Sequence, residues 1–568
     1  MEKKLDPIKY EIFVRRLGTI LEEGRKAIGM VSGSPAIVEG GECMTSLFDG
    51  DGNGVLAAVG TLFHVVGSGD AIKHAIKEYQ DSPGINDGDQ FYYADPYIAG
   101  THLMDQIAVK PIFYQGKRVA WVGTMTHTGD VGGLLRGIST EIFHEGARFR
   151  GIKMYEGGKV RKDLLDCITL QSRDPEFVTI DILARVASNN VCSEGFIRLV
   201  EKFGIEFVEA ASQKLREDFE KLAREKLKKL PNGTWRQRVY LSTTKNVDGK
   251  EVPVPLKIEC AMTKDGEGLT IDLTGTSAQN ADYRNATLAS ARSSMFAPLC
   301  TFLFYDLPWN AGMINFIKYI IPEGSFLNCR FPASCGLGTL CGINLMGAVA
   351  GCLVKMLYAA GLYEFVNSCW AEKGLGSAGF GPGVWYGGHS QHGGVVGQGT
   401  YDTFAGAGGA TPQRDGVNTG GIYANPSSAI SDVEFTEMYW PLLFLARRHG
   451  VDSGGYGKFR GGLNLEAIVM VYGSKDLNAD FLAGPEGGEI RGFGLFGGYP
   501  VGNILGDSVL LLTSKEDLLQ KLSKGRYPVS LSELGPQWGV NVRQSKSFKL
   551  ERELGGVRIS LPEYSLLG

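Results

Sequence analysis

The chain has 568 residues, of which 43% are hydrophobic and 21% are charged, and its formal net charge is -4. A chain of this length can bury a large core, and we expect two to four domains. The small negative net charge provides no basic field, which excludes nucleic acid as an expected partner. Glycine is the outlier, because its 79 residues are about twice the usual share. Tight turns and closely packed irregular backbone are therefore expected.

Cysteine usage and hydropathy indicate a reduced, cytoplasmic protein. The ten cysteines contain no CxxC spacing, and the N-terminal segment MEKKLDPIKY is charged and lacks an apolar signal segment. The most apolar stretch, residues 343–366, contains Lys355 and Glu364 and many small residues. It therefore predicts a buried helix and no membrane span.

The first third of the chain begins with a helix signal. Asp6 as N-cap and Pro7 at the first helical position predict a helix that runs to about Met30. A loop and a strand follow, and Glu42 at the start of this strand could join a site. His64 precedes a short helix over 70–79; a core or capping role is favoured for it, and a role in a site stays open.

Residues 106–126 have the pattern of two strands joined at Tyr114-Gln115-Gly116-Lys117. If Gln115-Gly116 is a two-residue loop, Tyr114 faces Lys117, and the same register places Met104 opposite His127. His102 is then a diagonal neighbour of His127 on one face, at roughly 7–8 Å between Cβ atoms.

Two histidines near this hairpin share one spacing, in His102-Leu-Met-Asp105 and His127-Thr-Gly-Asp130. Imidazole and carboxylate together suit Zn, Mn or Fe(II). His144, which follows a glycine-rich turn, could fold back as a further ligand. The alternative is that these residues are hydrogen-bonded polar groups at strand ends. The pairing of both motifs across one hairpin favours the metal site.

The remaining chain supports a β-rich α+β fold. Two helices are expected between 175 and 229, split at Phe203-Gly204, and a turn at 231–233 is a plausible domain boundary. We predict four regions: 1–232, an N-terminal α+β domain that carries the hairpin; 233–372, a β meander with a buried helix; 373–470, a glycine-rich, polyproline-II-like segment; and 471–568, a C-terminal β-rich region. His389 and His392 lie in the glycine-rich region, where a second metal site or a substrate contact stays open.

Several catalytic motifs do not occur in this sequence. It has no GxxxxGK[ST] phosphate-binding loop, no GxSxG nucleophile elbow, and no GxGxxG that opens a helix after a strand. Any chemistry therefore rests on the metal candidate or on a partner chain.

Six blocks, spread in order over roughly residues 5 to 500, resemble the hydantoinase B / 5-oxoprolinase C-terminal family, which includes the corresponding subunits of acetone and acetophenone carboxylases. They are DPYIAGTHLMD, HTGDVGG, STEIFHEGARF, DLTGTS, the Asn310-Ala-Gly312 turn and DSGGYGKFRGG. The resemblance implies a barrel-like β fold that runs into a bundle of short polyproline-II segments. It also implies a hetero-oligomer, in which an actin-like, hydantoinase A-type subunit binds Mg-ATP and phosphorylates the substrate.

The resemblance further implies a divalent metal. In the ketone carboxylases the B-like subunit holds it through an HxxD pair and a further histidine, which map onto His127, Asp130 and His144. Many members have two adjacent histidines where this chain has His127-Thr128, and an aspartate where this chain has Glu42. Residues 430–448 look closer to the ketone carboxylases than to the hydantoinases.

We therefore expect the metal-bearing subunit of an ATP-dependent ketone carboxylase of the acetone or acetophenone type. In this hypothesis the ketone is activated as an enol phosphate and bicarbonate as carboxyphosphate. The metal acts as Lewis acid and template, and Glu42 or Asp105 handles the proton. One alternative is an ATP-dependent cyclic amide hydrolase, of the hydantoinase, oxoprolinase or lactamase type. The other is a non-catalytic scaffold subunit with a structural metal.

Overall fold

The structure is a computed structural model. It describes residues 5–368 except 65, 135–138, 248–249 and 314–315. Toward the C-terminus it describes 384–390, 393–398, 407–421, 425, 430, 432–463, 465–473, 476–481, 493–499, 510–511, 520, 523–525, 557–562 and 566–567.

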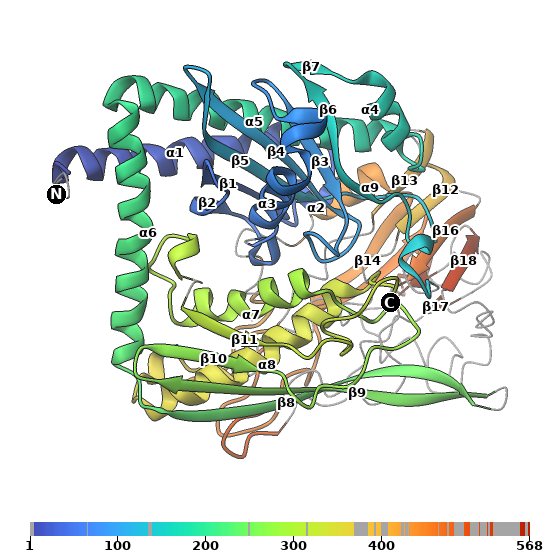
Figure 1. Cartoon of the computed structure of the whole chain (residues 1–568). Helices are drawn as coiled ribbons and strands as arrows, with labels where there is room; N and C mark the ends of the chain where they lie inside the picture. Colours follow the sequence, from blue (N-terminus) through green and yellow to red (C-terminus); the bar gives the residue numbers. More distant parts are fainter. Residues whose placement is uncertain are drawn as a thin grey trace.

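A seven-stranded sheet forms the upper part of the molecule (Figure 1), with strand order β2-β1-β5-β4-β3-β6-β7 and antiparallel neighbours. Its strands are β1 (Cys43–Asp49), β2 (Gly54–Val59), β3 (Gln90–Ala94), β4 (Asp105–Tyr114), β5 (Lys117–His127), β6 (Phe149–Glu156) and β7 (Lys159–Val160). The central strands are buried on both faces, so helices must cover both.

Helices α1 (Pro7–Val31) and α5 (Pro175–Phe203) pack against one face of this sheet, and α3 (Gly67–Tyr79) packs against the other. The predicted N-cap is confirmed, because the Asp6 side chain accepts hydrogen bonds from the N–H groups of the first turn of α1. The shorter helical segments of this region are α2 (Pro35–Val38), η1 (Leu62–His64), η2 (Gln80–Gly84), η3 (Ile142–His144) and α4 (Lys162–Thr169).

Helix α6 (Ile205–Lys228) runs from the level of the upper sheet down to a second sheet at the bottom of Figure 1. The second sheet has the order β11-β10-β9-β8. Its strands are β8 (Gly233–Val247), β9 (Lys250–Asp265), β10 (Gly268–Asp272) and β11 (Ile317–Ile320). The predicted helix split at Phe203-Gly204 and the predicted β meander are both confirmed.

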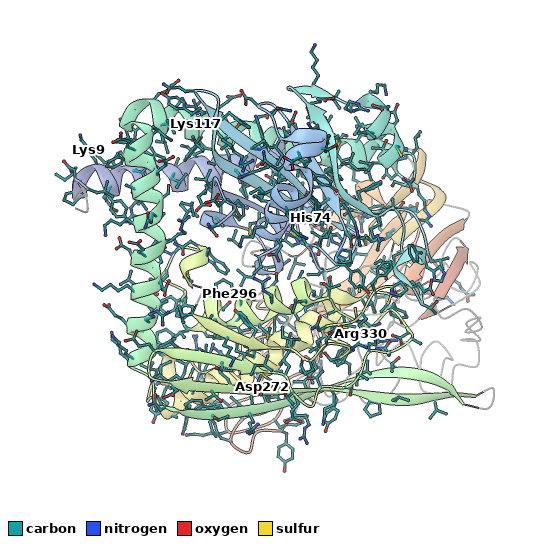
Figure 2. The ribbon with its side chains drawn as sticks, viewed as in Figure 1. Lys9, His74, Lys117, Asp272, Phe296 and Arg330 are labelled. Atoms are coloured by element: carbon teal, nitrogen blue, oxygen red, sulfur yellow. The ribbon has the colours of Figure 1, made fainter. Side chains whose placement is uncertain are left out.

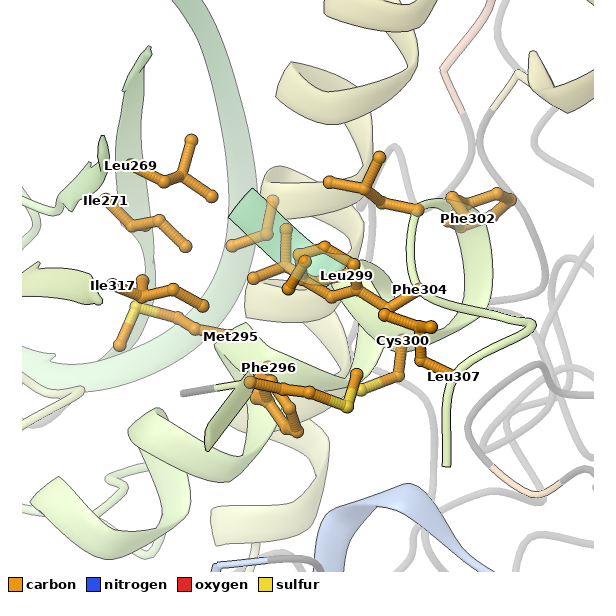
Figure 3. Close-up of a cluster of buried hydrophobic side chains, with 14 of the residues drawn as sticks. Leu269, Ile271, Met295, Phe296, Leu299, Cys300, Phe302, Phe304, Leu307 and Ile317 are labelled. Atoms are coloured by element: carbon orange, nitrogen blue, oxygen red, sulfur yellow. The ribbon is translucent and has the colours of Figure 1, made fainter. Parts of the chain in front are cut away.

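Two helices, α7 (Leu288–Phe302) and α8 (Gly338–Ala359), fill the space between the sheets; short turns η4 (Ala311–Met313) and η5 (Tyr363–Phe365) flank them. In Figure 2, Phe296 of α7 lies between His74 above it and Asp272 below it. Figure 3 shows Met295, Phe296 and Leu299 of α7 close to apolar side chains of β10 and β11. One hydrophobic cluster extends from Phe13 to Val366, across the predicted boundary at 232. The division of the chain at residue 232 into two domains therefore stays a prediction.

Helix α8 is long and apolar enough to span a membrane, but 94% of its most apolar window is buried inside the protein. It packs against α7, β8 and β9. The prediction of a buried helix at this position is therefore confirmed.

Two four-stranded sheets, of order β13-β12-β16-β18 and β14-β15-β19-β17, lie in the C-terminal part. Their elements are β12 (Val384–Ser390), β13 (Gly393–Gln398), α9 (Val433–Tyr439), β14 (Leu442–His449), β15 (Leu465–Val471), β16 (Asp476–Phe481), β17 (Leu510–Leu511), β18 (Val557–Pro562) and β19 (Leu566–Leu567). None of the four sheets closes into a barrel within the described residues, so the barrel-like feature of the predicted fold is not found there.

Glycines make close backbone crossings in this C-terminal part. A Cβ at Gly416 would lie 2.1 Å from the carbonyl oxygen of Gly408, and a Cβ at Gly462 would lie 2.0 Å from that of Val417. The expected close packing of irregular backbone is therefore present over these residues. Its polyproline-II conformation stays a prediction, and β12 and β13 are paired antiparallel strands.

Candidate metal centre

The hairpin of β4 and β5 turns at Gln115-Gly116, as predicted, and both residues have positive φ values of 50° and 77°. A β-bulge between Ile112 and Phe113 then shifts the register by one residue. The predicted pairing of Met104 with His127 is therefore wrong, and Asp105 lies opposite His127. This shift brings a carboxylate, in place of a thioether, next to the imidazole.

Polar residues at or near the ends of four neighbouring strands gather at the same end of the upper sheet. Because β2, β1, β5 and β4 alternate in direction, the end of β2, the start of β1, the end of β5 and the start of β4 meet there. His127 is the last residue of β5 and Asp105 the first of β4, Glu42 directly precedes β1, and His64 lies on η1, which follows β2. The turn that precedes β4 adds His102.

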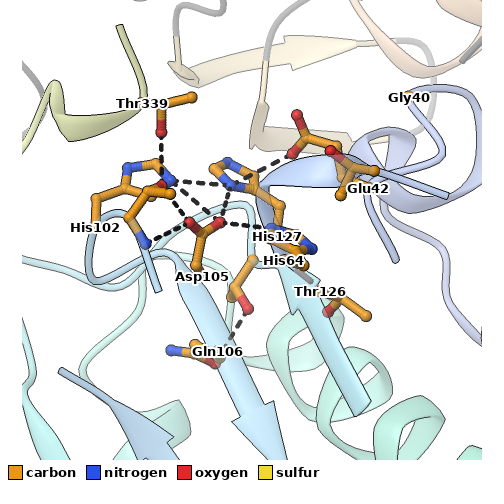
Figure 4. Close-up of polar contacts among 12 residues, drawn as sticks. Gly40, Glu42, His64, His102, Asp105, Gln106, Thr126, His127 and Thr339 are labelled. Carbon is orange, nitrogen blue, oxygen red and sulfur yellow. Dashed lines mark hydrogen bonds and ion pairs between the residues drawn. The ribbon is translucent and has the colours of Figure 1, made fainter. Parts of the chain in front are cut away.

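The two imidazoles and the Asp105 carboxylate form a compact triangle (Figure 4). His102 Nε2 lies 3.2 Å from His127 Nδ1 and 3.4 Å from Asp105 Oδ1. His127 Nδ1 lies 3.3 Å from the same oxygen. All three side chains are buried. The structure thus brings the side chains of His102 and His127 together.

The second oxygen of Asp105, Oδ2, accepts hydrogen bonds from Thr101. The backbone N–H of Thr101 donates to Asp105 Oδ2 at 3.0 Å, and the Thr101 hydroxyl donates to the same oxygen. The Thr339 hydroxyl, in the first turn of α8, lies 2.9 Å from that of Thr101. One carboxylate oxygen is therefore fixed, and the other faces the imidazoles.

The electrostatics favour an ionised Asp105. Burial alone would raise the pKa of its carboxyl, but the neighbouring His102 and His64 and the hydrogen bonds from His102 and His127 hold the pKa well below its usual range. A buried carboxylate with imidazole neighbours is a typical ligand set for a divalent cation.

The spacing of the three ligand atoms fits one metal ion. Atoms bound at about 2.1 Å to one ion lie about 3.0 Å apart in octahedral and about 3.4 Å apart in tetrahedral geometry. The separations here are 3.2, 3.3 and 3.4 Å. Two histidines and one carboxylate on one side of an ion leave further coordination positions for other ligands. His102, Asp105 and His127 are therefore the residues that could hold a metal.

Glu42 lies at the edge of this triangle. Its Oε2 atom is 3.4 Å from His127 Nδ1, and its side chain is 17% exposed. The backbone N–H of His127 donates to the carbonyl of Glu42 at 3.2 Å, which fixes the two strand ends side by side. Glu42 is thus the carboxylate of this centre with access to solvent.

His64 is also part of the cluster. Its Nε2 lies 3.3 Å from Asp105 Oδ1, and its buried Nδ1 has no hydrogen-bond partner among the described residues. The sequence left its role open because the η1 turn that carries it is too short to show periodicity. His389 lies on β12 with its side chain outside the described part, and His392 lies outside the described residues.

The structure does not bring the other two predicted ligands to the triangle. Asp130 is buried, and its carboxylate accepts hydrogen bonds from the Arg173 guanidinium at 2.8 Å, from the Arg173 backbone N–H and from the Ser172 hydroxyl. His144 is exposed and accepts a hydrogen bond at Nδ1 from the backbone N–H of Thr140. Asp130 and His144 therefore form hydrogen bonds with other residues and do not contact the triangle.

A polar network locks the opposite face of the same strands. Arg185 of α5 is fully buried and donates to the hydroxyls of Tyr92 and Thr128, and Thr128 donates to Gln106 at 3.0 Å. Gln106 follows Asp105, and Thr128 follows His127. Hydrogen bonds to the next residue therefore fix the backbone at Asp105 and at His127. Sequence spacing gave no signal for Arg185, which lies far away in the chain.

Residues 6–529 match the family described as hydantoinase B/oxoprolinase. The acetophenone carboxylase delta subunit of Aromatoleum aromaticum is 26% identical over 477 residues, covering 83% of this chain and 67% of that protein. The acetone carboxylase alpha subunit of Xanthobacter autotrophicus is 26% identical over 522 residues, covering 88% of this chain and 65% of that protein. This chain therefore spans about two thirds of the length of these two carboxylase subunits.

The solved structure of nucleotide-free acetone carboxylase superposes with a TM-score of 0.88 at 22% identity, over 100% of this chain and 75% of that chain. The ATP-dependent caprolactamase of Pseudomonas jessenii superposes with a TM-score of 0.74, over 84% of this chain and 80% of that chain. These relatives, enzymes of two reaction types, share the fold. Because the sequence match covers most of the chain, this protein belongs to the hydantoinase B/oxoprolinase family.

Proposed function

We propose that this chain is the metal-bearing subunit of an ATP-dependent ketone carboxylase. The observation that carries the proposal is the near-equilateral triangle of His102 Nε2, Asp105 Oδ1 and His127 Nδ1, with separations of 3.2 to 3.4 Å. This donor set and spacing fit Mn, Zn or Fe(II). The shared fold with acetone carboxylase, over the whole of this chain, supports a carboxylase function.

A bound divalent ion would supply Lewis-acid stabilisation to an enolate oxygen or to activated CO2. The protein residues divide the remaining work. His102, Asp105 and His127 hold the ion, and Thr101 fixes the orientation of Asp105. Sequence reasoning gave proton handling to Glu42 or Asp105. Asp105 is buried as a ligand, whereas Glu42 is 17% exposed at the edge of the triangle, so we assign proton transfer at the substrate carbon to Glu42.

The ATP chemistry is assigned to a partner. The sequence has no GxxxxGK[ST] loop, and its relatives are named as subunits of larger enzymes. We therefore propose a hetero-oligomer in which a hydantoinase A-like subunit consumes Mg-ATP and delivers activated ketone and bicarbonate to the metal centre.

Cyclic amide hydrolysis is the second candidate function. The fold also superposes on ATP-dependent caprolactamase, and the caprolactamase beta subunit of Pseudomonas jessenii is 25% identical over 385 residues. The same triangle would then position a nucleophilic water. This function requires no bicarbonate, and that separates it from the carboxylase.

The test uses the chain purified together with its ATP-hydrolysing partner. We expect about one Mn, Zn or Fe per chain by elemental analysis, and ATP-dependent incorporation of labelled bicarbonate into a ketone. His127→Ala is expected to lose both. Asp130→Asn is the control, because it changes the other polar residue of the same HxxD motif, whose carboxylate pairs with Arg173 away from the triangle, and it is expected to keep the metal.

Three results decide between the functions. Opening of a cyclic amide in bicarbonate-free buffer, without labelling of any ketone, would replace the carboxylase by the hydrolase. A metal coordinated only by protein atoms, in an inactive chain, would support the scaffold alternative. A metal-free wild type in an active complex would refute the metal centre itself.

A further inference from the structure

Two cysteines outside the metal centre have their sulfur atoms in contact. Cys329 and Cys335 lie on the segment between β11 and α8, and their Sγ atoms are 3.6 Å apart. Cys329 is 6% exposed and Cys335 is fully buried. Phe331, between them in the sequence, is 48% exposed. Cys329 is therefore the member of the pair that keeps a small contact with solvent.

The surroundings of Cys329 favour its thiolate. The Cys335 thiol lies within hydrogen-bond distance of its sulfur, as does the Tyr97 hydroxyl at 3.5 Å. Tyr97 has one hydroxyl proton and two further acceptors, the carbonyls of Ala333 at 2.8 Å and Arg330 at 3.3 Å, so this proton can turn to Cys329 when the thiol ionises. The hydrogen bond from Cys335 lowers the pKa of Cys329, against the effect of burial.

A second close pair in the same chain provides the contrast. Cys260 on β9 and Cys352 on α8 have sulfur atoms 3.8 Å apart, and both are fully buried. Their surroundings are apolar core, and the neighbouring thiol and burial raise the pKa of Cys260 well above its usual range. The two pairs thus share the close sulfur contact, but a small solvent exposure and a neighbouring hydroxyl are found at Cys329.

We propose that Cys329 and Cys335 form a dithiol site that hydroperoxides oxidise to an intramolecular disulfide. The Cys329 thiolate attacks the peroxide, the O–O bond breaks, and Cys329 becomes a sulfenic acid while alkoxide or hydroxide leaves. The Cys335 sulfur then attacks Cys329, the S–O bond breaks, and the thiol proton leaves with that oxygen as water. Two thiols and ROOH give one disulfide, ROH and water; the sulfurs lose two electrons and the peroxide gains them.

Closing this disulfide acts on the metal centre through two contacts. The sulfur atoms must approach from 3.6 Å to about 2.05 Å, so their segment must move. Thr339 follows Cys335 closely and contacts Thr101, which holds Asp105. Tyr97 packs against both the cysteine segment and the cluster that contains Met104. This coupling rests on the proposed metal centre, whereas the oxidation does not.

Peptide mapping tests the oxidation. Trypsin cleaves after Arg330, so Cys329 and Cys335 fall in separate peptides that only a disulfide holds together. The wild-type complex is treated with hydrogen peroxide, blocked with iodoacetamide and digested without reductant. We expect the linked pair of peptides, its loss on reduction, and its absence in Cys335→Ser, where dimedone traps a sulfenic acid on Cys329.

The core pair and an exposed cysteine serve as internal controls. Cys260 and Cys352 should stay reduced, and modification of the exposed Cys167 shows that the oxidant was active. If Cys167 is oxidised and the peptides of Cys329 and Cys335 remain unlinked, the dithiol proposal is overturned.

Metal affinity tests the coupling. Oxidised wild type should bind its metal about tenfold more weakly than reduced wild type, which is the size of effect expected for a disturbed supporting contact. Cys329→Ser should show no change on peroxide treatment. Linked peptides with unchanged affinity would overturn the coupling. Reduced protein that binds no metal would refute the proposed function and leave the oxidation result standing.

Discussion

His64 Nε2 lies 3.3 Å from Asp105 Oδ1, the oxygen that also faces His102 and His127. Hydrogen bonds to a ligating carboxylate orient it and tune its charge, and their loss weakens metal binding by about 10–100-fold. We expect His64→Leu to weaken metal affinity by that amount. His64→Gln, which keeps an N–H donor near the Nε2 position, should recover part of the loss. Competition with a chelator measures both.

His74→Leu is the matched control for this prediction. His74 lies on α3 and is within hydrogen-bond distance of the Tyr93 hydroxyl, away from the triangle. Its variant should bind metal as wild type does. Wild-type affinity in His64→Leu would show that His64 has no part in holding Asp105.

Asp130 should be a structural residue. It is 2% exposed and pairs with Arg173 at 2.8 Å, and Arg173 is 27% exposed, so its unpaired charge could still reach water. We expect Asp130→Ala to lower the free energy of unfolding by about 2 kcal/mol, less than for a fully buried pair, and to leave metal content unchanged. Denaturant unfolding and elemental analysis measure the two effects. Metal loss from a folded variant would return Asp130 to the ligand set.

Glu145 should make stability depend on pH. Burial raises the pKa of its carboxyl from 4.5 to about 7, although Ser334 and the backbone of Cys335 donate hydrogen bonds that lower it. The folded state therefore binds a proton between pH 4.5 and 7 that the unfolded state releases, so the free energy of unfolding falls as pH rises through this window, by about 3 kcal/mol at most.

The comparison with Glu145→Gln isolates this contribution, because other buried carboxyls titrate in both proteins. We expect the melting temperature of the variant to fall less than that of wild type between pH 5 and 7.5. The exposed Glu141→Gln, in the same turn, should behave as wild type. Parallel pH curves for wild type and Glu145→Gln would contradict the raised pKa.

Phe296 should be a major contributor to the core between the sheets. Its side chain is fully buried, and its ring meets that of Trp309 edge to face with centroids 6.1 Å apart. Phe296→Ala is expected to lower the free energy of unfolding by about 3–5 kcal/mol, because it leaves a cavity. Leu170→Ala, at a position 74% exposed, should change it by less than about 0.5 kcal/mol.

Local sequence signals predicted much of the N-terminal architecture. The Asp6-Pro7 cap, the split at Gly204 and the Gln115-Gly116 turn are each set by a few adjacent residues, and the structure has all three. The hairpin register could not be predicted to the residue. The bulge beside Phe113 depends on packing against other strands, and no residue in the turn encodes it.

The metal ligands, too, could be predicted only as far as adjacent residues determine them. Sequence reasoning found both HxxD motifs, and nothing in their spacing distinguishes the aspartate that faces an imidazole from the one that faces an arginine. Arg173, which pairs with Asp130, and Thr339, which supports the anchor of Asp105, both come from distant segments. Contacts of this kind depend on the folded arrangement, so local pattern reasoning could not supply them.

The contact between Thr339 and Thr101 has a consequence for biogenesis. The ligands belong to the first part of the chain, but the support for Asp105 is complete only when the first turn of α8 has been made and has docked. During synthesis, His102 and His127 would therefore be made well before the chain could bind an ion tightly. Tight binding of the metal would then come at the end of folding. A chain truncated before α8 would fail to retain the ion.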